Sequence, residues 1–356
     1  MKMRLFFFYA ILVGCVFAAR VADAQSLDAF AQNRRLGKGL NASLKTDLQG
    51  LRLIKNAGFQ SVRIPLRWDK NAAEDAPYQI DQKYFLEVDQ LLANAQQLGL
   101  NVVLDFHGCE GLTKEPDANK ARFMGIWKQV AERYKDQPDG VYYELLNEPS
   151  GNLEKQYNSL IAQTITAIRA IDSKHTLIVG GVWWSHVKGL SKLVLPKNET
   201  NLIATFHYYD PMVFTHQGAE WSSKYQTTGV VWPGPPPHPV VPVKGEESDF
   251  WHDYNTLPTA ENPAGPKRIN EAMDFADAWS KQHHVPLWLG EFGAYRRADM
   301  DSRIRWTQCV REAAEKRGIS WAYWEFDAGF GAYDRSTTSW REGLLHALIP
   351  PHQEAH

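Results

Sequence analysis

The sequence predicts a single (β/α)8 TIM barrel, and three observations support this fold class. Short apolar runs recur along the chain, segments with helical spacing lie between them, and polar residues stand where most of the runs end. Most runs are continuously apolar, which is typical of parallel strands that are covered on both faces. The chain has 356 residues, 44% of them hydrophobic, which suffices for one such barrel or for two ordinary domains.

The first half of the barrel is expected from four runs and the helical patterns around them. Strands are predicted at 36–40, 61–68, 101–107 and 141–146, the last three of which are dense in β-branched, aromatic and leucine residues. Helices are predicted at 45–57, 82–98 and 119–135. Gly58 and Gly99 follow two of these helices directly, at the position where glycine favours a helix end.

The second half repeats the same alternation. Strands are predicted at 176–183, 202–208, 286–291 and 320–324, with helices at 153–171, 268–283 and 300–316. An open doubly wound sheet is the alternative fold, but it usually has fewer units and a glycine-rich phosphate turn after its first strand. Gly37 and Gly39 lack a third glycine at the spacing that this turn requires.

One connection is abnormally long for a barrel. Residues 211–266 contain no clear periodic segment and include the proline-rich stretch 233–239. Loops of this length are usually functional or disordered. Because this one follows the sixth predicted strand, on the face where barrel enzymes keep their active site, we expect it to form a wall of a cleft. A simple surface insertion is the alternative.

Composition excludes some partners and favours others. The formal charge of −2 gives no basic excess with which to neutralise phosphates, so we expect no nucleic-acid partner. The chain has 13 Trp residues, and flat aromatic surfaces pack well against the faces of sugar rings. For any single Trp, a place in the hydrophobic core is as good an explanation as a sugar contact.

The N-terminus has the layout of an export signal. A short basic start precedes an apolar run, and Ala22-Asp23-Ala24 fits a small-x-small cleavage site. We therefore expect residues 1–24 to be a signal peptide, residues 25–356 to be the mature catalytic domain, and the protein to be secreted or periplasmic. Cleavage before Cys15, as in a lipoprotein, is the less favoured alternative. The apolar run is too short for a confident membrane span, so no stable membrane association is expected.

Cys109 and Cys309 remain after cleavage of that signal. The first follows the third strand and the second lies in a late helix, which are roughly opposite sectors of a barrel. We therefore expect two free, mostly buried thiols and no disulfide. We also expect a monomer.

Polar residues at the strand ends form the candidate site. They lie at the ends of the second, third, fourth, sixth, seventh and eighth predicted strands, and the carboxyl ends of parallel strands meet at one rim. Each alone has an ordinary structural explanation, but together they converge on one cavity. The residues are Arg63, His107, Asn147, Glu148, His207, Tyr209, Glu291 and Trp324.

This set resembles glycoside hydrolase family 5, the cellulase family of retaining barrel glycosidases. The resemblance spans the mature chain, and its most specific parts are Asn147-Glu148-Pro149, His207-x-Tyr209 and Gly290-Glu291-Phe292-Gly293. It implies an endoglucanase that cleaves β-1,4-linked glucan, with Glu148 as acid/base and Glu291 as nucleophile. Gly108-Cys109 departs from relatives that carry a further His or an aromatic residue there, which puts one binding contact in doubt.

The supporting residues suit such chemistry. Arg63 and Tyr209 can hold Glu291 ionised and aimed, whereas His207 can hydrogen-bond Glu148. Asn147 suits the sugar 2-hydroxyl, His107 another hydroxyl, and Trp324 the floor on which the sugar stacks. The segment 214–221 resembles the substrate loop of bacterial endoglucanases, which implies sugar contacts for His216 and Trp221. Asn41 and Trp184 are further candidate contacts, for which a structural role is equally plausible.

Several alternatives stay open at this point. Mannan, xyloglucan or mixed-linkage glucan would use the same machinery, and an inverting glycosidase would use the same residue types at wider separation. A catalytically inactive carbohydrate-binding barrel would keep only the aromatic cleft. A sugar-phosphate enzyme would need a phosphate nest near strands seven and eight, where only Gly329-Phe330-Gly331 qualifies, and we expect a flexible rim loop there. No metal or other cofactor is expected, because the His283-His284 pair lacks ligands at useful spacing.

Overall fold

The computed structural model describes residues 28–351. The expected signal peptide, including Cys15, lies outside the described residues. Within 28–351, no helix combines the length and the apolar character that crossing a membrane requires. Cys109 and Cys309 are free, as expected, and both are half-buried.

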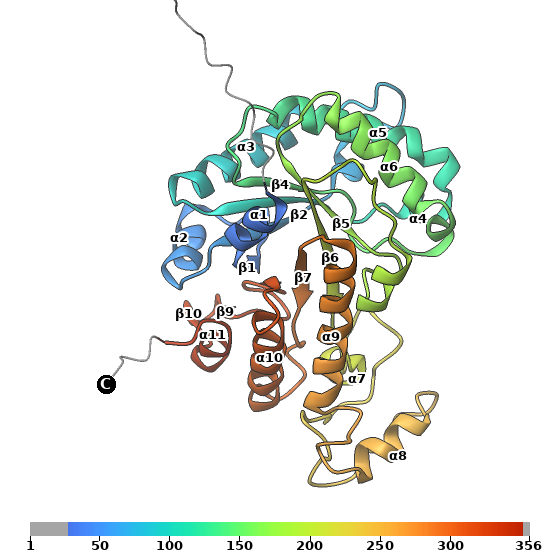
Figure 1. The fold of residues 1–356 in the computed structure, drawn as a ribbon. Coiled ribbons are helices and arrows are strands. Elements are labelled where there is room, and N and C mark those ends of the chain that lie inside the picture. Colours follow the sequence, from blue (N-terminus) through green and yellow to red (C-terminus); the bar gives the residue numbers. More distant parts are fainter. Residues whose placement is uncertain (1–27, 352–356) are drawn as a thin grey trace, which may run out of the picture.

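The strands close into a parallel barrel in the order β1 to β8, with β8 pairing back onto β1, so the predicted fold is confirmed (Figure 1). The doubly wound alternative is thereby excluded. The strands are β1 Lys38–Asn41, β2 Ser61–Leu66, β3 Asn101–Phe106, β4 Val141–Glu144, β5 Thr176–Gly180, β6 Leu202–Tyr208, β7 Leu287–Phe292 and β8 Ser320–Tyr323.

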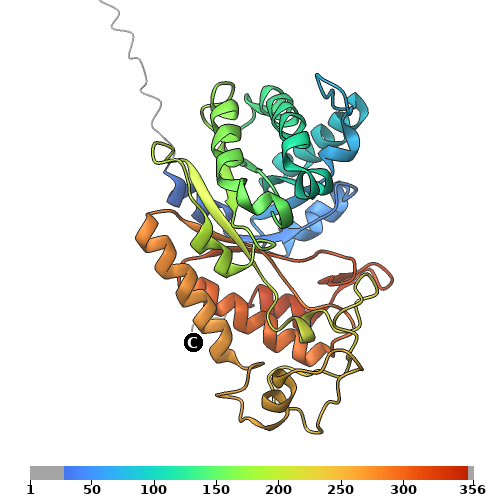
Figure 2. The same ribbon diagram turned by 90° about the vertical axis from the view of Figure 1, so that its right-hand side faces the viewer.

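Helices surround this barrel on all sides (Figures 1 and 2). Those that follow the strands are α2 Leu48–Asn56, α3 Gln82–Gln97, α4 Glu110–Lys114, α5 Pro116–Tyr134, α6 Tyr157–Arg169, α9 Pro266–His283, α10 Met300–Glu315 and α11 Glu342–Leu348. Gly58, Gly99 and Gly318 have φ of 104°, 64° and 68°, so each helix end uses a conformation that glycine adopts without steric cost.

The first predicted strand was placed too early. Leu36 belongs not to a strand but to a short helix, α1 (Ala29–Leu36), that precedes the barrel. The helix contacts β6 and β8 at the amino ends of the strands. Its backbone is tied to the barrel because the Tyr142 hydroxyl donates to the Gln32 carbonyl oxygen at 3.1 Å and Ser320 Oγ donates to that of Asn33 at 2.6 Å. The helix α1 therefore closes the bottom of the barrel.

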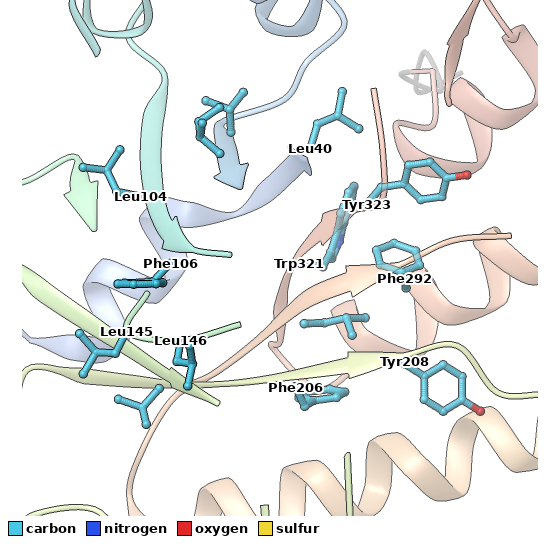
Figure 3. Packing of buried hydrophobic residues seen from close by; sticks show 14 of the residues in the cluster. Leu40, Leu104, Phe106, Leu145, Leu146, Phe206, Tyr208, Phe292, Trp321 and Tyr323 are labelled. Carbon is cyan, nitrogen blue, oxygen red and sulfur yellow. The ribbon is translucent and has the colours of Figure 1, made fainter. Parts of the chain in front are cut away.

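Two apolar layers flank the barrel wall. The inner layer lies inside the barrel, with Leu36 of α1 below it, and consists of Leu36, Val103, Tyr142, Ile178, Ile203, Trp288 and Ala322. The outer layer lies between strands and helices. Figure 3 shows part of it, with Phe206 and Tyr208 on β6 and Phe292 on β7. Strand residues alternate between the layers, as the period of two requires.

The segment 211–266 is ordered, and the expectation that it lacks periodic structure was wrong. It contains α7 (Met212–Thr215) and α8 (Asp249–Thr256), the latter outside the ring of helices in both views (Figures 1 and 2). Side-chain amides replace the missing secondary structure, because Gln217 bonds both the N–H and the carbonyl of Val230 at 3.1 and 2.8 Å. Asn262 Nδ2 donates to the carbonyls of Tyr254 and Leu257, both at 2.9 Å.

The connection after β5 departs from the regular βα pattern. Residues 181–183, predicted as strand, lie beyond β5, and Trp183, Trp184 and Ser185 have φ of 61°, 55° and 53°. Between β5 and β6 the chain forms a short 3-10 helix, η3 (Val187–Lys192), for which no helix was predicted. Left-handed backbone costs roughly 1–3 kcal/mol for each non-glycine residue and is concentrated at functional sites.

Candidate active site

Arg63 lies at the centre of the site and is fully buried inside the barrel. Its Nη1 donates to Glu291 Oε1 at 2.6 Å and to Asn41 Oδ1 at 3.0 Å. Its Nε and Nη2 donate to the two carboxylate oxygens of Glu144 at 2.6 and 3.0 Å. Because a guanidinium has five N–H donors in a planar fork, one side chain can organise this many acceptors.

The strand period explains why these charges face inward. Arg63 lies on the same side of β2 as Ser61. Asp105 follows Val103 of the inner apolar layer by two residues, and Glu144 follows Tyr142 by two, so both carboxylates also point into the barrel. Asp105 Oδ2 lies 3.0 Å from Arg63 Nη2. A charged layer therefore sits directly on the apolar layer that closes the barrel. Burial raises the pKa of Glu144 despite the opposing charge of Arg63. Burial lowers the pKa of Arg63, but the three carboxylates outweigh it and raise that pKa well above its usual value.

Glu291 reaches the same interior through an irregularity in β7. Phe206 pairs with Leu289, but His207 pairs with Glu291, so β7 has one extra residue, Gly290. A Cβ at Gly290 would lie 2.8 Å from Thr205 Oγ1, which only glycine avoids. The bulge shifts the alternation by one residue and turns Glu291 inward, beside His207.

Glu291 is held as a carboxylate. Tyr209 donates its hydroxyl to Glu291 Oε2 at 2.8 Å, while Arg63 occupies Oε1. Burial alone would raise the pKa of Glu291, but the charges of His207 and Arg63, with the Tyr209 hydrogen bond, lower it to about 2. Burial and the nearby Glu291 charge raise the pKa of Tyr209 well above its usual value, so the hydroxyl keeps the proton that it donates.

Glu148 lies just beyond β4 in a left-handed conformation, with φ of 48°. Its side chain is 31% exposed, against 6% for Glu291, so it faces the open side of the cavity. His207 Nδ1 lies 2.9 Å from Glu148 Oε1 and 3.6 Å from Glu291 Oε2. Burial lowers the pKa of His207, but the two glutamates outweigh burial and raise it.

The two carboxylates are close together. One carboxylate oxygen of Glu148, one of Glu291 and one ring nitrogen of His207 all lie within 4.8 Å of one another. Retaining glycosidases place their two carboxyl groups about 5–5.5 Å apart, whereas inverting enzymes need about 6.5–9.5 Å. The same three side chains could also act as ligands to a divalent metal ion, although a cation there would face the buried charge of Arg63 beside Glu291.

His107 and Trp324, which follow β3 and β8, stack on each other at the same rim. Their rings stack with centroids 5.6 Å apart and planes 8° from parallel. His107 Nδ1 lies 2.6 Å from Asp105 Oδ2, which fixes the ring and leaves Nε2 for other partners. Burial opposes the charged form, but Asp105 raises the pKa of His107.

Asn147 and Asn41 have different places in the site. Asn147 Oδ1 accepts from Arg63 Nη2 at 2.8 Å, which directs its amide N–H groups away from the arginine. Asn41 is fully buried, and its Nδ2 donates to the carbonyls of Gly290 and Tyr323 at 3.0 and 3.2 Å. These contacts favour the structural role for Asn41, because its polar groups hold Arg63 and the Gly290 bulge.

The substrate-loop residues and Trp184 border the site on other sides. His216 contacts Tyr209 edge-to-face at 5.0 Å, and Trp221 lies beyond it with 60% exposure. The Trp184 side chain is exposed, with 61% relative exposure for the residue. The backbone N–H of Trp184 donates to the carbonyl oxygen of Pro149, directly after Glu148, at 3.2 Å. These positions are compatible with sugar contacts, which stay predictions.

Three contributors were missed by the sequence analysis. Glu144 and Asp105 interrupt apolar strand runs, which was a usable signal, but only the residues at strand ends were considered. Phe330 was placed in a flexible rim loop, and this was wrong. It is buried, and its ring lies 6.1, 5.5 and 5.4 Å from those of Tyr209, His216 and Tyr295.

Comparison with known proteins gives consistent relatives. The family model described as cellulase (glycosyl hydrolase family 5) matches residues 31–329. Endoglucanase H of Acetivibrio thermocellus is 27% identical over 349 residues, and endoglucanase 3 of Fibrobacter succinogenes is 28% identical over 326. These alignments cover 93% and 84% of this chain but 34% and 48% of the relatives, so the chain spans a third to a half of their length.

Solved structures agree with this assignment. Cel5A of Thermotoga maritima in complex with cellobiose is 40% identical, with a TM-score of 0.79, and the match covers 90% of this chain and all of that one. The structure of the same relative with mannotriose gives 39% identity and a TM-score of 0.80, with the same coverage of both chains.

Proposed function

Because the chain belongs to the cellulase family, glycosyl hydrolase family 5, we propose that it is a retaining endo-glycosidase that cleaves β-1,4-linked glucan. The observation that carries this proposal is the pair Glu148 and Glu291. One carboxylate oxygen of each lies within 4.8 Å of one oxygen of the other, and the two side chains have different environments. One carboxylate is buried and held charged, while the other faces the open side of the cavity. Such an asymmetric pair separates a nucleophile from an acid.

In the first step, the Glu291 carboxylate attacks the anomeric carbon of the sugar. Glu148, in its protonated form, gives its proton to the departing glycosidic oxygen, and a covalent glycosyl-enzyme forms. Arg63 and Tyr209 keep Glu291 ionised and fix its direction, because each occupies one carboxylate oxygen. The ester no longer carries the Glu291 charge, so the neighbouring Glu148 is left as the base.

In the second step, Glu148 takes a proton from a water molecule, and the resulting hydroxide attacks the same carbon. Glu291 leaves as a carboxylate, and the product keeps its original anomeric configuration. Asn147 is oriented by Arg63 to donate to the sugar 2-hydroxyl. His107 and Trp324 supply a hydroxyl contact and a stacking surface, while His216, Trp221 and Trp184 extend the contacts along the cleft.

The substrate is proposed as β-1,4-glucan because the relatives compared are named endoglucanases and one solved relative binds cellobiose. Mannan is the second candidate, since a structure of the same relative is described with mannotriose as substrate. Xyloglucan and mixed-linkage glucan would use the same core machinery. We further infer that residues 1–24 direct export, that 25–356 form the mature catalytic domain, and that it acts as a monomer outside the cytoplasm.

The test uses hydrolysis of carboxymethylcellulose, barley glucan, lichenan, mannan and xylan, with product stereochemistry followed by NMR. Glu291→Gln and Glu148→Gln should each lower kcat by roughly 10³-fold or more while the melting temperature stays near that of the parent. Glu132→Gln, an exposed glutamate on α5, is the matched control and should leave activity unchanged. Full activity of Glu291→Gln, or inversion at the anomeric carbon, would overturn the mechanism.

A further inference from the structure

A cavity lies on the outer side of the barrel wall. It encloses about 590 Å³ between η3, the end of β6, α8 and α9. This volume falls in the range of about 300–1,000 Å³ that small-molecule sites occupy. The six-residue η3 contributes His186 at its N-cap and Val187, Lys188 and Ser191 to the lining.

Aromatic rings line this cavity from three different elements. Trp183 comes from the left-handed turn before η3, Phe250 from α8 and Phe275 from α9. Trp183 and Phe275 are each 38% exposed, which is unusual for side chains this large and leaves faces on which a ligand can pack. Lys192 Nζ lies 6.0 Å from the centroid of the Trp183 ring.

Polar side chains around the rings are paired in advance. Arg268 Nη1 donates to Glu271 Oε2 at 3.0 Å. His186 Nδ1 accepts from the backbone N–H of Lys188, so Nε2 carries the proton and donates to Asp210 Oδ2 at 3.0 Å. The two pairs place donors and acceptors beside the aromatic rings, a combination that suits the hydroxyl groups and ring faces of a sugar.

The charge of the cavity lining selects against ionic ligands. Lys188 and Arg268 supply the positive charges, and Asp210 and Glu271 balance them. With Lys192 over the Trp183 ring counted, one positive charge is left over, which is a small excess for a phosphate or a nucleotide. A neutral ligand with many hydroxyls and apolar ring faces fits both the charge balance and the aromatic surfaces.

Two short chain segments link the lining of this cavity to the rim that carries Glu148 and Glu291. Trp183 precedes Trp184, whose backbone N–H donates to the carbonyl oxygen of Pro149, next to Glu148. Asp210 directly follows Tyr209, the hydroxyl donor to Glu291. The left-handed turn therefore presents one tryptophan to the lateral cavity and the next one beside the catalytic loop, at the energetic cost that such a backbone carries.

We propose that this lateral cavity is a second glycan-binding site, which holds a neutral stretch of the same polysaccharide that the enzyme cleaves. The proposal rests on the function proposed above. Trp183, Phe250 and Phe275 pack against sugar rings, and the Arg268–Glu271 and His186–Asp210 pairs bond the hydroxyls. Holding the polymer here raises its local concentration at the catalytic cleft, so polymeric substrates gain more than short ones.

The test compares polymer binding with turnover of a small substrate. The variant Trp183→Ala/Phe275→Ala is made in the Glu291→Gln background, and retention by barley glucan is measured by affinity gel electrophoresis. Affinity should fall about tenfold. With Glu291 intact, the same double substitution should change kcat/KM on an aryl cellobioside by less than about twofold, because only the catalytic cleft binds that substrate.

Two further variants keep the result interpretable. Phe275→Ala/Arg268→Ala alters only exposed positions of α9, so it tests the cavity even if substitution of Trp183 disturbs its strained turn. Leu86→Ala, at a 56% exposed apolar position of α3, is the control and should bind barley glucan like the parent. Binding by both cavity variants equal to that of Leu86→Ala would overturn the second site while leaving the catalytic proposal intact. If the intact enzyme hydrolyses no β-glucan, the catalytic proposal is wrong as well.

Discussion

At the scale of single residues, the guanidinium of Arg63 contacts the carboxylates of Asp105, Glu144 and Glu291 inside the barrel, at distances of 2.6 to 3.0 Å. An arrangement with so many buried charges is stable only while every member is present, because removing one partner leaves the others desolvated and uncompensated. The position and charge of Glu291 therefore depend on Asp105 and Glu144 as well as on Arg63.

Replacing Arg63 should damage both stability and turnover. We expect Arg63→Lys to cost about 3–5 kcal/mol of unfolding free energy, since an ammonium cannot reproduce the planar fork that serves several acceptors. Urea denaturation and kcat on barley glucan measure the two effects. Arg34→Lys, at a side chain that is 69% exposed, should change neither. A wild-type denaturation curve for Arg63→Lys would contradict this account.

Asn41 acts on the reaction through Arg63. We expect Asn41→Ala to destabilise the fold by about 1–3 kcal/mol, because Arg63 and the Gly290 carbonyl each lose a buried hydrogen bond. It should lower kcat while KM for cello-oligosaccharides stays within about twofold. Asn147→Ala serves as the comparison. It removes the proposed hydrogen bond to the sugar 2-hydroxyl in the transition state, so it should lower kcat/KM. A large rise in KM for Asn41→Ala would restore its role as a sugar contact.

At the scale of elements, the short helix α1 and the bulge in β7 set the two ends of the barrel interior. The helix closes the amino ends of the strands with Leu36, and the bulge turns Glu291 into the cavity at their carboxyl ends. Neither feature follows from the βα alternation, yet together they decide where the apolar interior stops and where the polar cavity begins.

Removing the apolar contact of α1 should weaken the whole barrel. We expect Leu36→Ala to cost about 2–5 kcal/mol, because the side chain is fully buried against the inner layer and little can collapse into its place. Leu86→Ala, on the exposed face of α3, should stay within about 0.5 kcal/mol of wild type. Equal denaturation midpoints in urea for the two variants would show that α1 does not close the barrel.

Sequence analysis succeeded where local pattern and long-range structure agree. The strand rhythm placed all eight barrel strands to within a few residues, and the strand ends pointed to Arg63, Glu148, His207 and Glu291. It failed where tertiary contacts override local preference. Trp183 to Ser185 are held left-handed against their own propensities, and Asn41 is buried by pairing that no local pattern reveals. A glycine inside the seventh predicted strand, Gly290, was visible in the sequence. Only the pairing of β7 with β6 shows that it forms a bulge.

At the scale of the whole molecule, ionisable groups link the site to stability. Burial opposes their charged forms, yet the Asp105 contact raises the pKa of His107, and Glu291 with Glu148 raises that of His207. The pKa of Glu291 is lowered to about 2 by His207 and Arg63. The folded protein therefore binds protons differently from the unfolded chain at both ends of the pH scale.

Stability should accordingly be greatest at mildly acidic pH. The two histidines stabilise the fold fully below about pH 6.5, and this contribution is lost as the pH rises through their higher folded values. Glu291 stabilises the fold above about pH 4.3, and its contribution is lost as the pH falls toward 2. Thermal melting from pH 3 to 9 measures both limbs. His107→Asn should flatten the alkaline limb, whereas His346→Asn, at an exposed side chain, should not; an unchanged limb in His107→Asn would refute the assignment.

Closure of the barrel also governs how folded copies meet one another. Each of β1 to β8 has a partner on both sides, so the barrel offers no open row of backbone N–H and C=O groups to a neighbouring chain. Within residues 28–351, free strand edges are confined to the two-residue strands β9 (Tyr333–Asp334) and β10 (Ser339–Trp340). The described part of the chain therefore offers almost no strand edge on which a second folded copy could add a strand.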